Sequence, residues 1–363
     1  MALEVGIVGL PNVGKSTLFR ALTRVEAEAA NYPFCTIEPN VGMVPVRDPR
    51  LQRLTELVEP NQTIPAMLRV VDIAGLVKGA SQGEGLGNQF LSHIRQVDAI
   101  AHVVRCFADE NVVHVDGAPD PIRDIEVIQT ELILSDLEQV ERKLERLRKQ
   151  VKGNQKVAVV IPVFEKMLAH LGDGKLAHSG DWPLEELEIF AELSLITSKP
   201  SLYIANVSEE GLSEASEFEV ALRELAAREQ VEVIPICAQV ESELAEMEED
   251  EARAFMGEMG ICHSGTAQLA RSGYQLLNQI NYFTAGKKEV RAWEVQRGSS
   301  APQAAGKIHS DFEKGFIRAE VYHFNDLDSL GSEAAVREAG RWRLEGRDYI
   351  VQDGDIMHFR FNV

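Results

Sequence analysis

The sequence lacks the features of a membrane protein or a secreted protein. It has no run of about 18 uninterrupted apolar residues, so we expect no membrane-spanning helix and no membrane partner. The segment Met1–Thr17 has no basic region ahead of its apolar stretch, which predicts a strand rather than a signal peptide. The 4 cysteines are scattered without metal-ligand spacing, so we expect reduced, mostly buried thiols in a cytoplasmic protein. They are Cys35, Cys106, Cys237 and Cys262.

Positive charge is also scarce. The chain has 37 Lys and Arg residues against 57 Asp and Glu, a formal net charge of −20. This balance argues against non-specific nucleic-acid binding by the whole surface, so any contact with RNA requires a local basic patch. No aromatic platform of the kind that stacks single-stranded bases is visible. The length of 363 residues predicts two or three domains.

The first third alternates short apolar segments with helical patterns, which predicts a doubly wound α/β sheet. A long gap separates the fourth candidate strand from the fifth, so we expect this domain to be interrupted between about residues 120 and 200. The candidate strands are Glu4–Val8, Val41–Val46, Met67–Asp72, Ala99–Cys106, Ser201–Val207 and Val231–Ile236.

The interruption has a helical pattern. Apolar residues alternate at steps of four and three, a spacing that suits a coiled-coil seam. Gly153–Asn154 provides a break, so a helical hairpin is predicted. A third helix is expected to begin at Pro183, with Asp181 as its cap. The apolar positions are Leu137, Val140, Leu144, Leu147 and Val151, then Val160, Phe164, Met167 and Leu171.

The last part of the chain has a different texture. An acidic helix is expected from Glu241 to Glu251, and a further helical stretch to about Asn278. Short strands are then expected around Glu289–Val295, Ile317–Val321 and Met357–Phe361, separated by turns rich in Gly and Asp. This pattern predicts a small, separate α+β module.

A phosphate-binding motif follows the first strand. Residues 9–16 read GLPNVGKS, a full GxxxxGK[ST] match between a strand and an apolar-periodic helix. The loop from Asn12 through Val13 and Gly14 lets backbone N–H groups converge on the β-phosphate. Lys15 is expected to reach the β- and γ-phosphates, and the Ser16 hydroxyl to ligate Mg²⁺, with Thr17 opening the helix.

Two further segments complete this predicted site. Asp72 ends an apolar strand and opens a DxxG motif, so its carboxylate can support Mg²⁺ while the Gly75 N–H meets the γ-phosphate. Thr36 lies in a loop between the two motifs and is a candidate for the second hydroxyl ligand of Mg²⁺. A glycine-rich loop follows Asp72 and can become ordered when a γ-phosphate is present. Its glycines are Gly75, Gly79, Gly83, Gly85 and Gly87.

The base-recognition segment departs from that of GTPases. Asn206-Val207-Ser208-Glu209 stands where GTPases carry NKxD, whose Asp accepts the N1–H and 2-amino groups of guanine. Here Val207 replaces the Lys, and Glu209, one methylene longer, replaces the Asp, so the hydrogen bonds matched to guanine are lost. Adenine offers a carboxylate no equivalent donors, so the segment indicates a preference for ATP, with GTP binding more weakly. A GTPase of the same architecture is the alternative.

With these motifs the chain resembles the YchF-type Obg-like ATPases over essentially its full length. The resemblance is carried by LPNVGKST, NYPFCTIEPN, DIAGLVKGASQGEGLGNQFL, the NVSE variant and the C-terminal QDGDIMHFRFNV. It implies a Ras-like P-loop NTPase domain (1–120 and 200–278), a coiled-coil insertion (121–199) and a C-terminal, ubiquitin-like TGS domain (279–363). It also implies ATP as substrate and association with ribosomes. Ala238 matches the last base-contacting loop of the family.

Hydrolysis needs a group that orients water, and the usual Gln after DxxG is replaced by Leu76. His114 lies in the segment where the family carries a histidine and is a candidate in cis; an exposed loop histidine is the alternative. A ribosomal partner completing the site in trans is another possibility. Asn12 stands where related proteins bind K⁺, which makes K⁺ a further candidate cofactor.

Basic residues gather near the tip of the expected hairpin. This cluster makes ribosomal RNA a candidate partner, against the simpler interpretation of a solvated helix face. A nucleotide-gated adapter with incidental hydrolysis remains a third hypothesis. The tip residues are Arg142, Lys143, Arg146, Arg148, Lys149, Lys152 and Lys156, and the C-terminal module adds Lys287, Lys288, Arg291, Lys307, Lys314 and Arg318.

Overall fold

The structure is a computed structural model that describes residues 3–29, 40–73, 86–109, 112, 114, 117–150 and 155–362. It divides into two compact units. The first contains 3–25, 40–42 and the described residues from 69 to 266. The second contains 26–29, 43–68 and 267–362, so two segments near the N-terminus belong with the C-terminal residues.

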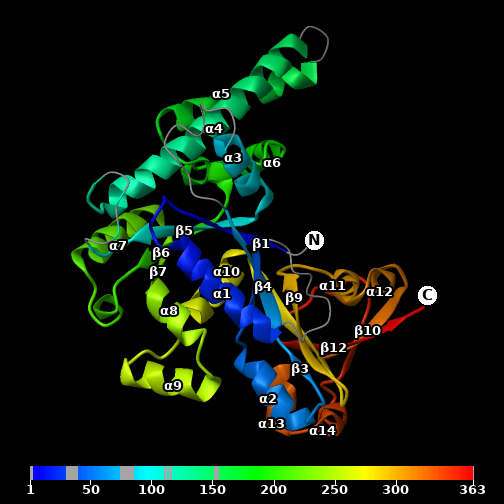
Figure 1. Cartoon of the computed structure of the whole chain (residues 1–363). Coiled ribbons are helices and arrows are strands. Elements are labelled where there is room, and N and C mark those ends of the chain that lie inside the picture. Colours follow the sequence, from blue (N-terminus) through cyan, green and yellow to red (C-terminus); the bar gives the residue numbers. More distant parts are fainter. Residues whose placement is uncertain are drawn as a thin grey trace. The chain divides into compact units, whose positions relative to one another are not determined.

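A six-stranded sheet in the order β2-β4-β1-β5-β6-β7 is built from the strands expected from the sequence (Figure 1). β1 pairs in parallel with β4 and β5, and the parallel pairing continues from β5 through β6 to β7. The central strand β5 is buried along its whole length, as expected for a parallel sheet covered on both faces. The strands are β1 (Glu4–Val8), β2 (Val41–Val46), β4 (Ala66–Asp72), β5 (Ala99–Arg105), β6 (Ser201–Asn206) and β7 (Glu232–Ile236).

Helices connect these strands. One segment that was expected to form a single helix forms two. The predicted acidic helix Glu241–Glu251 is wrong: α8 ends before Ala245, and α9 begins after Glu248. The chain leaves α8 because the N–H groups of Glu246 and Met247 bond three residues back, to the carbonyls of Glu243 and Leu244, instead of continuing the α-helical pattern. The helices are α1 (Lys15–Ala29), α3 (Leu86–Gln96), α7 (Glu217–Glu229), α8 (Ala238–Leu244), α9 (Glu249–Glu258) and α10 (Gly265–Leu276).

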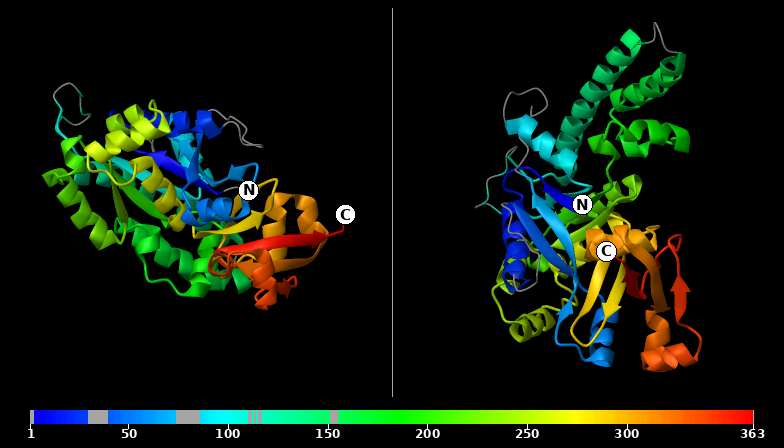
Figure 2. Two further views of the ribbon diagram at one scale, coloured as in Figure 1. Left: turned by 90° about the horizontal axis from the view of Figure 1, so that it is seen from below. Right: turned by 90° about the vertical axis from the view of Figure 1, so that its right-hand side faces the viewer.

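The predicted helical hairpin is present. α4 (Pro121–Gln150) and α5 (Gln155–Gly172) run side by side and project from the sheet of the first unit (Figure 2). Val140, Leu144, Phe164 and Met167 form its buried seam. The predicted break at Gly153–Asn154 lies outside the described residues. The third helix, α6 (Leu184–Ala191), starts one residue later than expected, because Pro183 is its N-cap and no side chain, including that of Asp181, caps it.

The second unit has its own six-stranded sheet, in the order β11-β10-β12-β8-β9-β3. Helix α11 contributes buried alanines to its core, and β3 pairs in parallel with β9. The strands β8 and β3 and the helix α2 did not stand out in the sequence. The strands are β3 (Thr63–Ile64), β8 (Gln279–Ala285), β9 (Val290–Gln296), β10 (Phe316–His323), β11 (Arg343–Glu345) and β12 (Asp355–Phe361). The helices are α2 (Pro49–Val58), α11 (Ala301–Ile308), α12 (Ser310–Lys314), α13 (Phe324–Leu330) and α14 (Glu333–Glu338).

Asp48 explains why residues 43–68 belong to the second unit. Its side chain caps α2 by accepting from the Arg50 N–H at 3.0 Å, and it accepts from Asn281 Nδ2 at 2.9 Å. Arg50 in turn donates to Asp353 at 2.9 Å. These charge-assisted bonds join segments that are distant in sequence.

The described cysteines are free thiols and most are buried, as expected. Cys106 and Cys237 are buried free thiols, and burial raises the pKa of each. Cys262 is an exposed free thiol, and Cys35 lies outside the described residues. No described helix is both long enough and apolar enough to cross a bilayer.

Asp136, in α4, binds the segment of chain that leaves the helical insertion and leads back to the sheet. Its fully buried carboxylate accepts from the Ile196 N–H at 2.9 Å, and from the N–H and hydroxyl of Thr197 at 2.8 and 2.7 Å. Burial raises the pKa of Asp136, and these donors offset part of that rise. The turn Ile196–Ser198 leads directly into β6.

Replacing Asp136 with Ala should therefore loosen the base of the insertion. Three buried donors would lose their acceptor, which costs about 3 kcal/mol or more in local stability. Hydrogen exchange at the Ile196 and Thr197 amides is expected to accelerate strongly. The matched control Glu141→Ala alters an exposed carboxylate of the same helix and should leave exchange unchanged. Equal protection in the Asp136 variant would contradict this role.

Candidate nucleotide-binding site

The phosphate-binding loop lies between β1 and α1, as its motif predicts. Asn12 and Gly14 adopt positive φ values of 61° and 93°, which turn the chain sharply. The Gly14 carbonyl then accepts from the N–H groups of Thr17 and Leu18 and so starts the helix. The helix begins at Lys15, with the Ser16 side chain exposed at its N-terminus. Free backbone N–H groups at such a terminus favour an anion.

Lys15 and Asp72 meet in this structure. Lys15 Nζ lies 2.5 Å from Asp72 Oδ1, and the lysine is largely buried. Lys15 follows the loop after β1, and Asp72 ends β4. These two strands are parallel neighbours, so the segments that follow them leave the same edge of the sheet. The pair places a cation that can contact phosphate beside a carboxylate that suits a hard metal ion.

Asn206 braces the phosphate-binding loop from the end of β6. Its buried side chain donates from Nδ2 to the Val13 carbonyl at 2.8 Å and accepts at Oδ1 from the Ala238 N–H at 3.1 Å. A Cβ atom on Gly14 would overlap Asn206 Nδ2, so only glycine fits there. The loops after β1, β6 and β7 are thus joined through one amide side chain.

The residues that replace the guanine-recognition pair lie in different environments. Val207, at the position of the lysine, is buried in an apolar cluster with Leu222 and Val240. Glu209 is exposed at the start of a short 3-10 turn, Glu210–Leu212, and its side chain does not cap that turn. Ala238 is buried at the start of α8. Positions 207 and 209 therefore carry neither the lysine nor the aspartate that recognises guanine.

His114 is buried, unlike the exposed loop histidine of the alternative interpretation. Its Nε2 lies 2.9 Å from Asp124 Oδ2, in the first turn of α4. Burial raises the pKa of Asp124, while the bond to His114 acts in the opposite direction. Sequence reasoning overlooked Asp124, although an acidic residue in a first helical turn is a recognisable signal.

Arg105 is a second residue that the sequence did not single out. It is fully buried at the end of β5 and donates to the carbonyls of Phe107, Asp109 and Val112 at 3.1, 3.0 and 2.9 Å. These bonds shape the segment that leads to His114. A buried arginine that satisfies backbone carbonyls has no short sequence signature.

Several predicted site residues lie outside the described residues. These are Thr36, Gly75, Leu76, Gly79, Gly83 and Gly85. Gly87 is part of α3. Among the described residues, no group of three or more His, Cys, Asp or Glu side chains could hold a metal ion. The carboxylate and hydroxyl of Asp72 and Ser16 instead suit Mg²⁺, which is commonly held by one or two side chains together with phosphate oxygens.

Replacing Asn206 with Ala should weaken binding of ATP and GTP by the same factor. The variant loses two hydrogen bonds that hold the phosphate-binding loop, which predicts a loss of about tenfold in affinity. Equilibrium titration with fluorescent nucleotide analogues measures both values. Gln239→Ala changes an exposed neighbour and is the control. A change in the ATP-to-GTP ratio would contradict a bracing role and indicate direct base contact.

Comparisons with known proteins cover the whole chain. A family model described as "50S ribosome-binding GTPase" matches residues 4–166. The YchF-GTPase C-terminal model, described as "Protein of unknown function", matches 279–362. The "Ribosome-binding ATPase YchF" of Bacillus subtilis is 55% identical over 366 residues, with 100% of both chains covered. Its namesake in Haemophilus influenzae is 54% identical over 364 residues, again with 100% of both covered.

A solved structure agrees with these relatives. The structure of the Schizosaccharomyces pombe YchF GTPase superposes with a TM-score of 0.91 and 42% sequence identity. The match covers 99% of this chain and 97% of that one. The sequence resemblance to YchF-type proteins is therefore confirmed, together with the P-loop α/β fold. This chain belongs to the YchF family of P-loop nucleotide-binding proteins.

Proposed function

We propose that this chain is a Mg²⁺-dependent ATPase that associates with ribosomes and acts as a nucleotide-dependent switch in translation. One observation carries the proposal: a braced phosphate site stands beside a base site without the guanine-recognition residues. Asn206 still holds the phosphate-binding loop, whereas Val207 is buried and Glu209 is exposed. Phosphate binding is thus retained while the basis for guanine selectivity is lost.

The Lys15–Asp72 pair supports the phosphate and metal part of the proposal. We infer that Lys15 exchanges Asp72 for the β- and γ-phosphates when a nucleotide binds, which leaves the carboxylate available near the metal. Ser16, Asp72 and Thr36 are the proposed Mg²⁺ residues, and bound Mg²⁺ would neutralise charge on the phosphates. K⁺ near Asn12 is proposed as an additional source of positive charge.

The names of the relatives give different nucleotides as the substrate. The Bacillus subtilis and Haemophilus influenzae proteins are named ATPases, whereas the Schizosaccharomyces pombe protein is described as a GTPase. GTP hydrolysis is therefore the second candidate function. Val207 lacks the cation of the usual lysine, and Glu209 places its carboxylate one methylene further out than the usual aspartate. The hydrogen bonds matched to the N1–H and 2-amino groups of guanine are therefore lost, which favours adenine.

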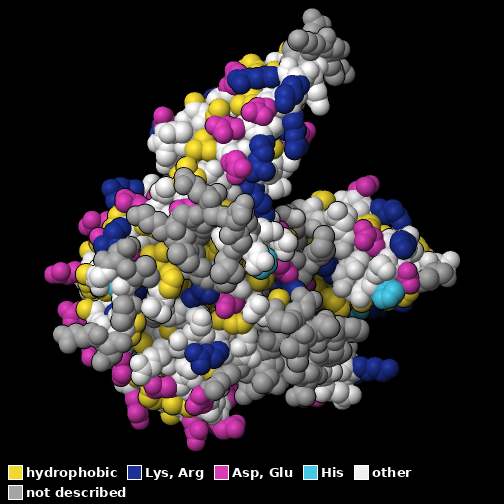
Figure 3. All heavy atoms as spheres, turned by 45° about the horizontal axis from the view of Figure 1, so that its top comes forward, with side chains coloured by type: hydrophobic (Ala, Val, Ile, Leu, Met, Phe, Trp, Pro, Cys, Tyr) yellow, Lys and Arg dark blue, Asp and Glu magenta, His cyan; other side chains and the backbone are white. Residues whose placement is uncertain are grey.

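We also propose the three-part organisation 1–120 with 200–278, 121–199, and 279–363, the last being a TGS domain. It differs from the compact units in that 26–29, 43–68 and 267–278 are grouped with the C-terminal residues in those units. The hairpin α4–α5 is a distinct projection within the first unit, which supports the middle boundary pair. Its basic surface is the proposed ribosome contact. In Figure 3 Lys and Arg side chains gather along one side of this projection. A ribosome-bound location in the cytoplasm follows from the proposal.

Ribosomes should increase ATP turnover by the purified protein, because Leu76 cannot orient water and intrinsic hydrolysis is expected to be slow. Phosphate release is measured with Mg²⁺ and K⁺, with and without ribosomes. Lys15→Ala is the control and should stay at background in both conditions. Negligible turnover by the wild-type chain with ribosomes and K⁺ would favour the adapter hypothesis instead.

His114→Ala distinguishes catalysis in cis from completion in trans. If His114 orients the attacking water, turnover should fall by roughly 100-fold or more while ATP affinity stays unchanged. Asp124→Asn keeps the shape of its partner and should give a smaller loss, with an altered pH profile. Undiminished ribosome-stimulated turnover in His114→Ala would assign the missing group to the ribosome.

A further inference from the structure

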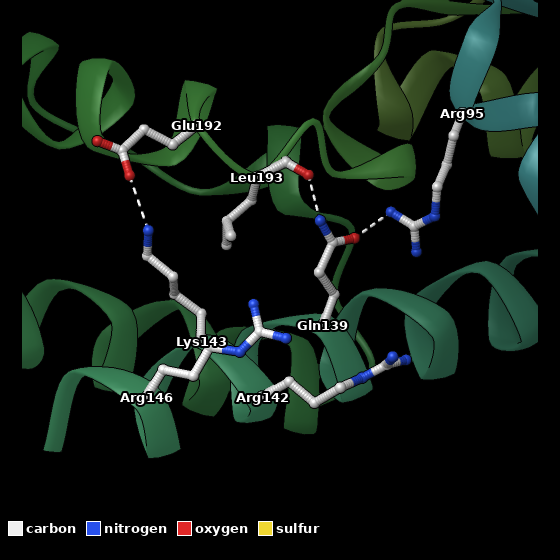
Figure 4. Close-up of a pocket in the computed structure, with 7 residues that line it drawn as sticks. All are labelled: Arg95, Gln139, Arg142, Lys143, Arg146, Glu192 and Leu193. Atoms are coloured by element: carbon white, nitrogen blue, oxygen red, sulfur yellow. Dashed lines mark hydrogen bonds and ion pairs between the residues drawn. The ribbon is translucent and has the colours of Figure 1, made fainter. Parts of the chain in front are cut away.

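A pocket opens within the first unit, between the insertion and α3. Its volume is about 440 Å³, within the range of small-ligand sites. Helix α4 forms one wall, the last turn of α3 contributes Arg95, and the segment after α6 closes the third side (Figure 4). The lining residues are Arg95, Gln139, Arg142, Lys143, Arg146, Glu192 and Leu193.

The lining is strongly cationic in a chain of net charge −20. Glu192 is the one carboxylate among the lining residues, against four cationic side chains. Lys143 Nζ lies 2.8 Å from Glu192, and Arg142 pairs with Glu138 at 2.8 Å. The two glutamate side chains are 65% and 59% exposed, so these pairs are weak and an incoming anion can displace them.

Arg146 is the residue best placed to bind an added ligand. Figure 4 shows its guanidinium in the space between Lys143 and Gln139. Within the part of the chain that the structure describes, no hydrogen bond or ion pair engages this guanidinium. An arginine offers a fork of donors that matches phosphate oxygens.

Hydrogen bonds hold the Arg95 side chain in place on one side of the pocket. Its guanidinium donates to Gln139 Oε1 and, at 2.8 Å, to Ser135 Oγ, while Gln139 donates to the Leu193 carbonyl. Burial lowers the pKa of Arg95, and the nearby Arg142 cation lowers it further, against the opposing effect of Asp136.

We propose that this pocket binds clustered phosphates, supplied either by an RNA backbone or by a free polyphosphate. Arg146 contacts the phosphates directly, with Arg142 and Lys143 beside it and Arg95 at the back. The RNA source rests on the proposed ribosome association, whereas the free polyphosphate does not. Of the basic residues on the hairpin, this proposal assigns phosphate binding only to those that line the pocket. Arg148 lies two residues from Arg146 but does not line the pocket, and it pairs with Glu165 at 2.7 Å.

The test compares Arg146→Ala with Arg148→Ala in the full chain. Both changes remove one exposed arginine from the same helix, so their effects on net charge and folding are matched. Two probes are used: a fluorescently labelled short RNA duplex and radiolabelled inorganic tripolyphosphate. Saturating ADP occupies the phosphate-binding loop throughout, so that tripolyphosphate binding there does not contribute. Binding of a fluorescent ATP analogue should be equal in both variants and confirms that they are folded.

Arg146→Ala is expected to weaken one probe by roughly tenfold, whereas Arg148→Ala should weaken it by less than about twofold. If that probe is the RNA duplex, the dependence of log affinity on log salt should also fall by about one, the signature of one lost phosphate contact. Loss of tripolyphosphate alone assigns the pocket to a free polyphosphate. Equal effects of the two variants on both probes, or no effect of either, would overturn the proposal. Failure of the proposed function would appear separately, as wild-type protein without ribosome-stimulated turnover.

Discussion

The candidate nucleotide site depends on the parallel direction of the strands in the first sheet. Because β1, β4, β5, β6 and β7 run in the same direction, the loops that follow them leave at one edge. Asn206 fixes the positions of two of these loops relative to each other, because its side chain donates to the Val13 carbonyl and accepts from the Ala238 N–H. Since β6 and β1 are separated in the sheet by β5, no backbone ladder could join their loops directly. The same contact explains the requirement for glycine at position 14.

A second set of polar contacts connects this domain to the helical hairpin. Asp136 holds the chain entering β6, and Arg95 links the end of α3 to α4 through Ser135 and Gln139. α3 follows the glycine-rich segment that begins after Asp72, so a change near the γ-phosphate has a short covalent path to α3. Its partners on α4 adjoin the cationic pocket. In a switch of this architecture, a structural change on nucleotide binding or hydrolysis would reach the basic surface through α3 and the polar contacts of Arg95 with α4.

Local patterns predicted much of the fold. The apolar strands, the phosphate-binding loop and the hairpin seam each depend on residues close in sequence, and each was found. The division of the acidic segment into α8 and α9 was not predicted, because the segment 245–248 carries no Gly or Pro that would mark the turn between them. The strand β3 was missed because its two residues form a strand only by pairing with distant β9.

The candidate site shows the same contrast. Lys15 and Asp72 could be placed from their motifs, whereas the pairing of His114 with Asp124 and the carbonyl contacts of Arg105 arise from tertiary packing. The base site was interpreted from missing residues, which give no position for the base itself. Val207 and Glu209 then proved to be buried and exposed, respectively. These environments come from the fold rather than from the four-residue segment.

The central claim is that phosphate recognition has been kept while guanine recognition has been lost. Competitive titration of the wild-type protein with ATP and GTP, in Mg²⁺ and K⁺ and against one fluorescent analogue, tests it most directly. The account predicts a clear preference for ATP. Clear preference for GTP would contradict it, leave the phosphate chemistry intact, and identify this chain as a GTPase that recognises guanine without the usual lysine and aspartate.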